Sequence, residues 1–339
     1  MKEKRYRESE VLREKLLESQ NILILTHVNP DGDAIGSTLA MSEILKKLGK
    51  KSRVITPNDF PDFLHWMEGT ENILVYFRKE KTVKKLAEKA DLILCIDFSD
   101  SRRLEKAEDV IINSAAFKIL IDHHPDPAGF TDMIISDTLL GSSAEIIYHL
   151  IKDMGFEHLI DKPVAENLYT GIMTDTGNFS FASSYSEIWC TVASLIKKGI
   201  DKDKIYSLVY DNYSEKRMRM MGYCLYENMD VYDDYHTAVI ALSQEELERF
   251  DHKPGDTEGF VNLPFSIRGL KLSALFLEKN DHIRISLRSR GDFSVNELSR
   301  KHLNGGGHTN AAGGELKMPL KDAVEKFREI LENYKEELQ

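Results

Sequence analysis

The sequence has little cysteine, with Cys95, Cys190 and Cys224 as isolated thiols in 339 residues. Without paired spacing, neither a disulfide framework nor a cysteine-based zinc site is expected. Cys95 stands inside the apolar run 92–96, which indicates a buried strand position. No apolar run approaches the roughly 20 residues of a membrane helix, and the charged amino terminus does not resemble a signal peptide. We therefore expect a cytoplasmic protein without disulfides and without a membrane partner.

Positive charge is also scarce: 45 Lys and Arg stand against 56 Asp and Glu, a formal net charge of −11. Because non-specific binding of long nucleic acid depends on many phosphate contacts with Lys and Arg, this composition argues against such a partner. It does not exclude a small phosphorylated substrate, since carboxylate-bound metal ions can supply positive charge locally.

The first half alternates short apolar runs with segments of helical periodicity. The expected strands are 21–26, 53–56, 91–96, 118–121 and 133–135. The expected helices are 34–48, 142–154, 163–174 and 185–198. Alternation of this kind predicts an α/β fold with a mostly parallel sheet flanked by helices. In such sheets, ligands bind beyond the carboxyl ends of the strands.

The character of the sequence changes after Gly199. A polar stretch follows, and then strand-like runs at 236–242, 272–278 and 282–288, a glycine-rich segment and a charged amphipathic helix. A chain of this length exceeds one ordinary core. We therefore predict an α/β domain over 1–200, a linker over 201–215 and a smaller α+β domain over 216–339.

Acids and histidines follow the ends of four predicted segments, which should meet at one edge of the sheet. They are His27, Asp31 and Asp33; Asp97; Asp122, His123 and His124; and Asp175. Taken singly, each cluster is an ordinary turn or cap. A calcium loop beginning at Asn29 is excluded, because Ala34 and Ala40 stand where Gly and Glu are required. Four clusters at one edge instead indicate a ligand site.

A mixed set of imidazoles and carboxylates suits Mn, Fe or Zn. Two such ions close together would stabilise the attacking and leaving oxygens of a displacement at phosphorus. Two ions need about six or seven ligands, one of them shared. The sequence offers His27, Asp31, Asp33, Asp97, His123 and Asp175 as ligands. Asp122 and His124 remain for acid–base and orienting roles.

This series, with Gly305-Gly-Gly-His308, resembles the DHH phosphoesterases and their DHHA1 domain over nearly the whole chain. In length and layout the chain is similar to the bacterial nanoRNase and pAp phosphatase group. The resemblance implies two divalent ions, manganese first among them. One would be held by His27, Asp31 and Asp97, and the other by Asp33, Asp97, His123 and Asp175. The catalytic residues would be Asp97, as the bridging ligand, His124, which helps to protonate the leaving oxygen, and Asp122, which orients its neighbours.

In the second domain, the resemblance points to Arg288 and His308 as contacts for the phosphate end of the substrate. Gly306 and Gly307 would let the backbone approach closely. An interdomain cleft would then admit only a short substrate, so activity should fall with RNA length. Arg103 either reaches the cleft of the first domain or forms a surface salt bridge.

The implied function is hydrolysis of short oligoribonucleotides, of 3′-phosphoadenosine-5′-phosphate (pAp) to AMP and phosphate, or of both. A phosphodiesterase for linear or cyclic di-adenylate is the nearest alternative, because it would differ only in base contacts. An inorganic pyrophosphatase ranks lower, since the Gly-Gly-Gly-His segment resembles the nucleotide-acting group better. A catalytically silent nucleotide-binding protein also ranks lower, because no ligand is missing. The oligomeric state is left open, with a homodimer as one option.

Overall fold

The computed structural model describes residues 4–253 and 255–339. The chain forms two compact units that divide between Asn212 and Tyr213. Within the predicted linker 201–215, the structure has a helix, α8 (Lys202–Tyr210), which begins at the capping residue Asp201. Over the same described ranges, every helix is too short or too polar to cross a bilayer.

The first unit contains a six-stranded sheet in which all neighbouring strands are parallel, as predicted. Its order is β3 (Leu74–Val75), β2 (Lys51–Thr56), β1 (Asn21–Leu25), β4 (Leu92–Ile96), β5 (Phe117–Asp122) and β6 (Met133–Ser136). The strands β1, β4 and β5 are neighbours at its centre. Their carboxyl ends therefore meet at one edge.

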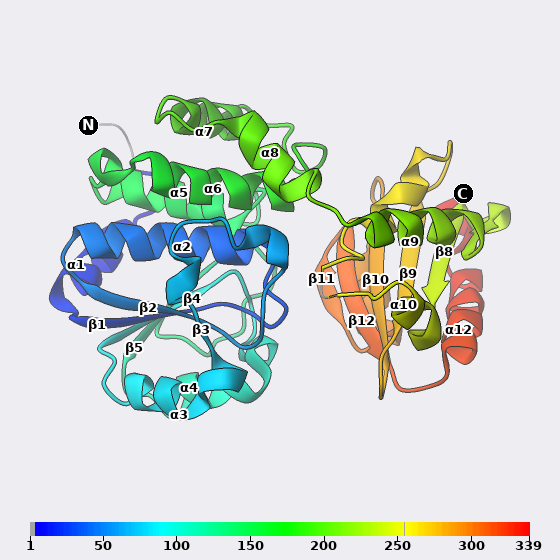
Figure 1. Cartoon of the computed structure of the whole chain (residues 1–339), viewed down its shortest axis with the longest axis horizontal. Helices are drawn as coiled ribbons and strands as arrows, with labels where there is room; N and C mark the ends of the chain where they lie inside the picture. The colour runs from blue at the N-terminus through cyan, green and yellow to red at the C-terminus, as the bar shows by residue number, and fades with distance from the viewer. Residues whose placement is uncertain (1–3, 254) are drawn as a thin grey trace. The chain divides into compact units, whose positions relative to one another are not determined.

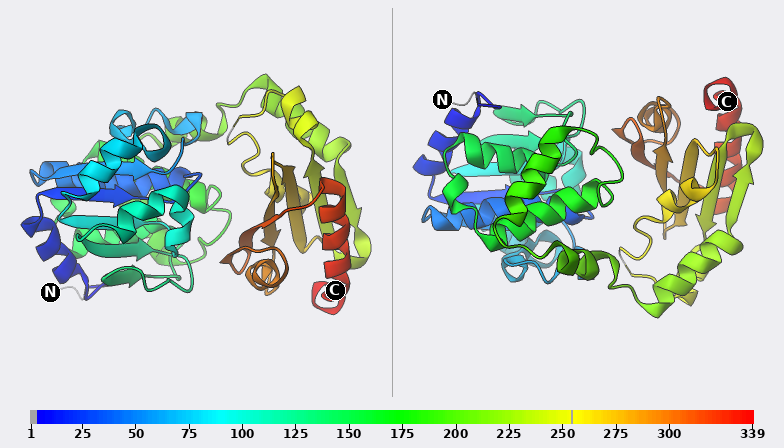
Figure 2. Two further views of the ribbon diagram at one scale, coloured as in Figure 1. Left: turned by 90° about the horizontal axis from the view of Figure 1, so that it is seen from below. Right: turned by 90° about the horizontal axis from the view of Figure 1, so that it is seen from above.

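Helices cover both faces of this sheet (Figures 1 and 2). On one face lie α2 (Gly32–Lys47), α5 (Ser143–Asp153) and α6 (Lys162–Asp175), and α1 (Ser9–Glu18) packs into the same core. The helix α7 (Ser186–Ile196) packs on the outer side of α5 and α6. The other face of the sheet carries α3 (Tyr76–Ala87) and α4 (Glu108–Ile112). Within β1, Ile22 and Ile24 pack into the first core, and Leu23 and Leu25 into the second. This alternation follows from the two-residue period of a strand.

The second unit is a smaller α+β unit, also as predicted. Its sheet has the order β11 (Gly306–His308), β12 (Ala311–Leu316), β10 (Ile283–Ser289), β9 (Leu272–Glu278), β8 (Thr237–Leu242) and β7 (Met229–Tyr232). The pair β8–β9 is parallel, and the other pairs are antiparallel.

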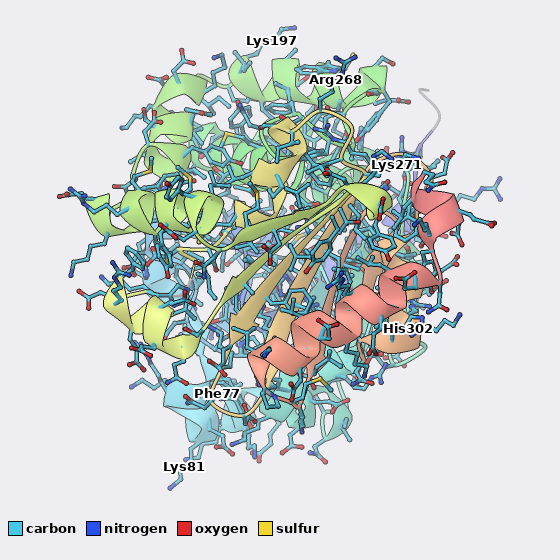
Figure 3. All side chains as sticks on the ribbon, turned by 90° about the vertical axis from the view of Figure 1, so that its right-hand side faces the viewer. Phe77, Lys81, Lys197, Arg268, Lys271 and His302 are labelled. Atoms are coloured by element: carbon cyan, nitrogen blue, oxygen red, sulfur yellow. The ribbon has the colours of Figure 1, made fainter. Side chains whose placement is uncertain are left out.

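Three helices pack on this second sheet. The helix α12 (Leu320–Glu332) packs on one face of the sheet (Figure 3), and it shares a core with α11 (Val295–His302). The helix α9 (Glu215–Tyr226) contributes to the core on the other face, over β8 and β9. The short helices α10 (Gln244–Arg249) and α13 (Lys335–Leu338) complete the unit.

Candidate metal centre

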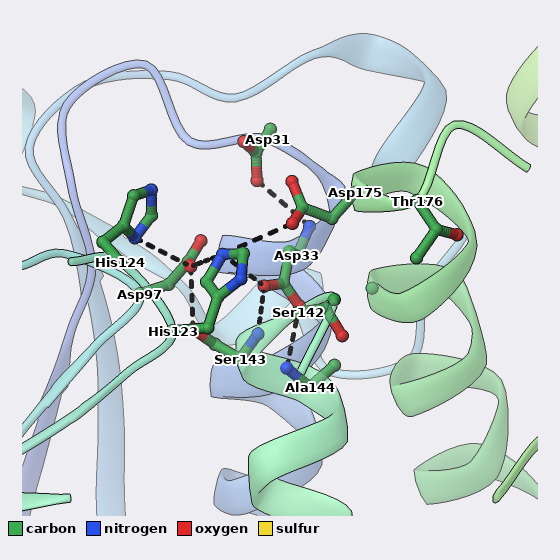
Figure 4. A network of polar contacts seen from close by, with 12 residues as sticks. Asp31, Asp33, Asp97, His123, His124, Ser142, Ser143, Ala144, Asp175 and Thr176 are labelled. Atoms are coloured by element: carbon green, nitrogen blue, oxygen red, sulfur yellow. Dashed lines mark hydrogen bonds and ion pairs between the residues drawn. The ribbon is translucent and has the colours of Figure 1, made fainter. Parts of the chain in front are cut away.

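The predicted ligands come together at the carboxyl edge of the first sheet (Figure 4). The strand β1 ends two residues before His27, β4 ends immediately before Asp97, and β5 ends at Asp122, immediately before His123. Asp31 caps α2 by accepting hydrogen bonds from the backbone N–H groups of Asp33 and Ala34. Asp175 is the last residue of α6.

His27, Asp31 and Asp97 form the first ligand group, with one potential ligand atom from each within 4.8 Å of the others. His27 Nε2 lies 3.5 Å from Asp97 Oδ2 and 4.0 Å from Asp31 Oδ2. The other ring nitrogen, Nδ1, is 2.8 Å from the carbonyl oxygen of Val28. A carbonyl only accepts, so Nδ1 carries the proton and the lone pair of Nε2 faces the carboxylates.

Asp33, His123 and Asp175 form the second group. His123 Nε2 lies 3.3 Å from Asp175 Oδ2, 3.5 Å from Asp97 Oδ1 and 4.0 Å from Asp33 Oδ2. His123 and Asp33 are buried, whereas the Asp175 side chain is 30% exposed. The second group is therefore open to solvent on the Asp175 side.

Asp97 lies between the two groups, because its Oδ2 faces His27 and its Oδ1 faces His123. Its backbone has a φ of 70°, in the left-handed region that non-glycine residues seldom adopt. Such backbone strain concentrates at functional sites. Ser143 Oγ donates a hydrogen bond of 2.8 Å to Asp97 Oδ1, which fixes the orientation of the carboxylate.

Asp33 is held by the amino terminus of α5. The backbone N–H of Ser143 donates to Asp33 Oδ2 at 2.6 Å, and that of Ala144 donates to Oδ1 at 2.9 Å. The free N–H groups and the dipole of a helix start favour a negative charge at this point. Sequence reasoning missed Ser143; the only signal was the run Gly141-Ser142-Ser143 at a predicted helix start.

Glycines bring α2, α5 and α6 close together beneath the site. A Cβ atom on Gly36 would lie 2.5 Å from the carbonyl oxygen of Asn167, so α2 and α6 are in backbone contact there. A Cβ on Gly171 would lie 2.8 Å from Asp33 Oδ1 and 2.7 Å from Ala144 Cβ. The absence of a side chain at Gly171 therefore leaves room for the Asp33 carboxylate.

The acidic groups repel one another at close range. Burial and the nearby charges of Asp97 and Asp31 raise the pKa of Asp33 well above its usual value. Burial and the charges of Asp31 and Asp175 do the same to the pKa of Asp97. Burial lowers the pKa of His27, which keeps the imidazole neutral and able to act as a ligand. A divalent cation fits this donor set, because it would offset the repulsion between the carboxylates.

His124 is paired with Asp122, which is fully buried. His124 Nδ1 lies 2.7 Å from Asp122 Oδ1 and 3.9 Å from Asp97 Oδ1. Burial raises the pKa of Asp122 to about 6. Burial, followed by the charges of Arg103 and His27, lowers the pKa of His124 to about 3. At pH 7 His124 is therefore neutral and Asp122 is mostly ionised.

Arg103 lies beside the loop that carries His27, since its carbonyl oxygen accepts a hydrogen bond of 2.8 Å from the N–H of Val28. Its charge lowers the pKa of His27 and His124, after burial in each case. In the described part of the chain, no salt bridge holds the exposed Arg103 guanidinium. The neighbouring Arg102 instead bonds Asp100, with Nε 2.9 Å from Oδ2. The geometry therefore favours a position of Arg103 beside the cleft of the first domain over a surface salt bridge.

In the second unit, Arg288 of β10 and His308 of β11 both lie opposite Ala311 of β12. Residues directly opposite one another share a face, so both side chains flank Ala311, two strands or roughly 10 Å apart. This is the face of Arg284 and Ser286, whereas Ile283, Ile285 and Leu287 pack into the core. Gly306 and Gly307 belong to the hairpin formed by β11 and β12, and a side chain at Gly307 would collide with the carbonyl oxygen of Ala311.

Comparison with known proteins gives the family. The DHH family, N-terminal domain, matches residues 21–172, and the DHHA1 domain matches residues 233–338. The bifunctional oligoribonuclease and PAP phosphatase NrnA of Thermus thermophilus is 31% identical over 94% of this chain and 90% of that protein. The protein of the same name from Bacillus subtilis is 28% identical over 87% of this chain and 89% of that protein.

Among solved structures, an exopolyphosphatase-related protein from Bacteroides fragilis is 44% identical, with a TM-score of 0.92 over 97% of both chains. Fold, site and relatives agree, and the chain belongs to the DHH family of phosphoesterases. Its DHH domain lies in the first unit and its DHHA1 domain in the second.

Proposed function

We propose that the chain hydrolyses the phosphoester bonds of pAp and of short oligoribonucleotides, with two divalent ions held at the carboxyl edge of the first sheet. His27, Asp31 and Asp97 would hold one ion, and Asp33, Asp97, His123 and Asp175 the other. The observation that carries this proposal is the position of Asp97, whose two oxygens each lie 3.5 Å from a histidine of a different group. The names of the relatives support the substrate class.

Imidazole and carboxylate ligands that occur together without cysteine suit Mn, Fe or Zn, and we propose manganese because the family resemblance places it first. Divalent ions there would supply positive charge to the phosphoryl oxygens and acidity to a water nucleophile. The protein keeps the carboxylates ionised and orients them as ligands. Ser143 does this for Asp97 and Asp33, through its hydroxyl and its backbone N–H.

His124 would move the proton. With Nδ1–H donated to Asp122, the neutral imidazole presents Nε2 as an acceptor. A pKa of about 3 means that Nε2 of His124 carries no proton when substrate arrives at neutral pH. We infer that His124 first accepts a proton from water and then returns it to the leaving oxygen. The ionised Asp122 stabilises the imidazolium between these two steps.

Arg288 and His308 would bind the terminal phosphate of the substrate. The guanidinium of Arg matches two phosphate oxygens at once. Arg284 lies on the same face of β10, four residues away and thus on the far side of Ser286. It provides a matched control, because it has the same chemistry at a different distance from His308.

The test is release of phosphate and nucleotide by the purified chain with Mn²⁺. The panel contains pAp, pApA, cyclic di-adenylate, RNA from two to about twenty residues, pyrophosphate and tripolyphosphate. We expect turnover of pAp and of the shortest RNAs. We also expect a loss of about 10³-fold or more in Asp97→Ala, because both ions lose a ligand.

For Arg288→Ala, we expect a higher KM for pAp, with a smaller change in Arg284→Ala. Preferred hydrolysis of cyclic di-adenylate would establish the alternative phosphodiesterase instead. Equal cutting of twenty-residue and two-residue RNA would contradict the preference for short substrates. Binding of pAp without turnover of any substrate would refute the enzymatic proposal.

A further inference from the structure

Phe181 is an exposed aromatic residue in the loop that directly follows the ligand Asp175. Its side chain is 43% exposed, although Phe is usually buried. The previous aromatic residue of the loop, Phe179, packs inward against Tyr169 and Trp189, with ring centroids 6.0 and 5.2 Å away. Phe179 therefore anchors the loop, and Phe181 is left for another role.

The loop holds Phe181 close to Asp175. The N–H of Phe181 donates a hydrogen bond of 3.0 Å to the carbonyl oxygen of Thr176, the residue after Asp175. The ring covers Gly177, where a Cβ atom would lie 2.6 Å from the Phe181 ring. Any side chain at Gly177 would displace this ring. The aromatic surface therefore lies against Gly177, two residues after a proposed ligand whose own side chain is 30% exposed.

The backbone of this loop is strained. Gly177, Asn178 and Phe179 have successive φ values of 54°, 53° and 62°, and Ala182 has 41°. Consecutive left-handed residues are sparsely populated and persist only where surrounding contacts enforce them. Here, Thr176 Oγ1 accepts from the N–H of Phe179, and Ser183 Oγ donates to the Phe179 carbonyl oxygen. A strained and well-anchored loop that displays one aromatic ring beside a ligand is typical of a binding element.

We propose that Phe181 is a stacking surface for the nucleobase of the nucleotide whose phosphate is cleaved. This inference rests on the proposed phosphoesterase function and adds to it the residue that would recognise the base of the substrate. Bases stack on exposed aromatic rings without regard to sequence, as short mixed RNA requires. Inorganic polyphosphate has no base and gains nothing from Phe181, so this residue would favour nucleotides over it.

The test compares substrates with and without a base. With Mn²⁺, kcat/KM is measured for pAp, for ribose 3,5-bisphosphate and for tripolyphosphate, in the wild type, Phe181→Ala, Phe181→Trp and Phe77→Ala. Phe77 on α3 is the matched control, since it is 49% exposed and lies beside Lys81 at the periphery (Figure 3). Phe181→Ala should lower kcat/KM for pAp about 10-fold or more. The same variant should leave kcat/KM for ribose 3,5-bisphosphate unchanged. Phe181→Trp should restore kcat/KM for pAp. Phe77→Ala should match the wild type on every substrate.

Equal losses on pAp and on ribose bisphosphate in Phe181→Ala would overturn the inference, because the ring would then only support the loop. Unchanged pAp turnover would overturn it as well. Calorimetric binding of pAp and ribose bisphosphate in Ca²⁺ separates this failure from failure of the proposed function. If the wild type turns over nothing but binds pAp in a Phe181-dependent way, the stacking inference stands alone. If Phe181→Ala binds pAp as tightly as the wild type, the stacking inference is wrong.

Discussion

His124 Nδ1 lies 2.7 Å from Oδ1 of Asp122, and this buried carboxylate fixes both the tautomer and the orientation of the imidazole. The pair resembles other carboxylate–histidine pairs in which the acid keeps the base aligned and stabilises its protonated form. Because Asp122 is completely buried, water cannot replace it as the partner of Nδ1. The contribution of Asp122 to the reaction can therefore be isolated with an isosteric substitution.

We expect Asp122→Asn to lower kcat for pAp by about 10²- to 10⁴-fold, the range for loss of a positioned proton-transfer group. The amide removes the charge that stabilises protonated His124, and it no longer enforces one tautomer. Steady-state kinetics measures the effect, with bound manganese and the melting temperature as controls. A kcat within a factor of two of the wild type would contradict a role for this pair in proton transfer.

Arg103 should set the acid limb of the pH–rate profile. Its charge contributes, after burial, to the lowering of the pKa of His124 to about 3. In Arg103→Ala that pKa should rise toward the ordinary value of about 6.5. Below its pKa His124 is protonated and cannot accept a proton. The acid limb of kcat/KM for pAp should therefore move to higher pH in the variant.

Arg102→Ala is the control for this experiment, because Arg102 bonds Asp100 and is 84% exposed. Its profile should overlay that of the wild type. A similar shift in both variants would indicate a general charge effect at the surface. No shift in Arg103→Ala would mean that the limb belongs to another group.

The shared position of Asp97 makes a prediction about metal content. Purified wild type loaded with Mn²⁺ should hold two ions per chain. His27→Ala should lose the ion of the first group and keep the other, because His27 belongs to one group only. Asp97→Ala should weaken both. Elemental analysis after desalting measures the content, with the exposed His65→Ala as the control. Identical metal content in His27→Ala and Asp97→Ala would argue against a bridging carboxylate.

Much of this site could be predicted from sequence because parallel strands deliver their carboxyl ends to one edge. Once the runs before His27, Asp97 and His123 were interpreted as strands, their convergence followed from the fold class alone. The roles of Ser143 and Ala144 could not be predicted, because backbone N–H groups have no residue signature. The neutral state of His124 could not be predicted from the sequence either, because it depends on burial and on the charge of Arg103.

Some elements of the fold lacked a clear signal as well. The helix α3 was not predicted, because only Tyr76, Val83 and Ala87 are buried in a segment rich in lysine. The strand β3 has two residues, too few for a period-two pattern. In contrast, β10 alternates buried and accessible residues, so the common face of Arg284, Ser286 and Arg288 could be predicted from the sequence.

The space above Gly171 offers a test of how strictly the helices position Asp33. In Gly171→Ala the new methyl group would lie 2.8 Å from Asp33 Oδ1 and 2.7 Å from Ala144 Cβ, so either the carboxylate or α5 must move. Overpacking of this kind costs about 1–3 kcal/mol.

Gly222→Ala is the matched control, since Gly222 is also helical and a Cβ there meets nothing within 4 Å. That control should gain about 0.5–1 kcal/mol in the free energy of unfolding. Urea unfolding and Mn²⁺ titration measure both variants. We expect Gly171→Ala to lose stability and metal affinity together, and retention of full Mn²⁺ affinity would mean that Asp33 is not a ligand held in place by this contact.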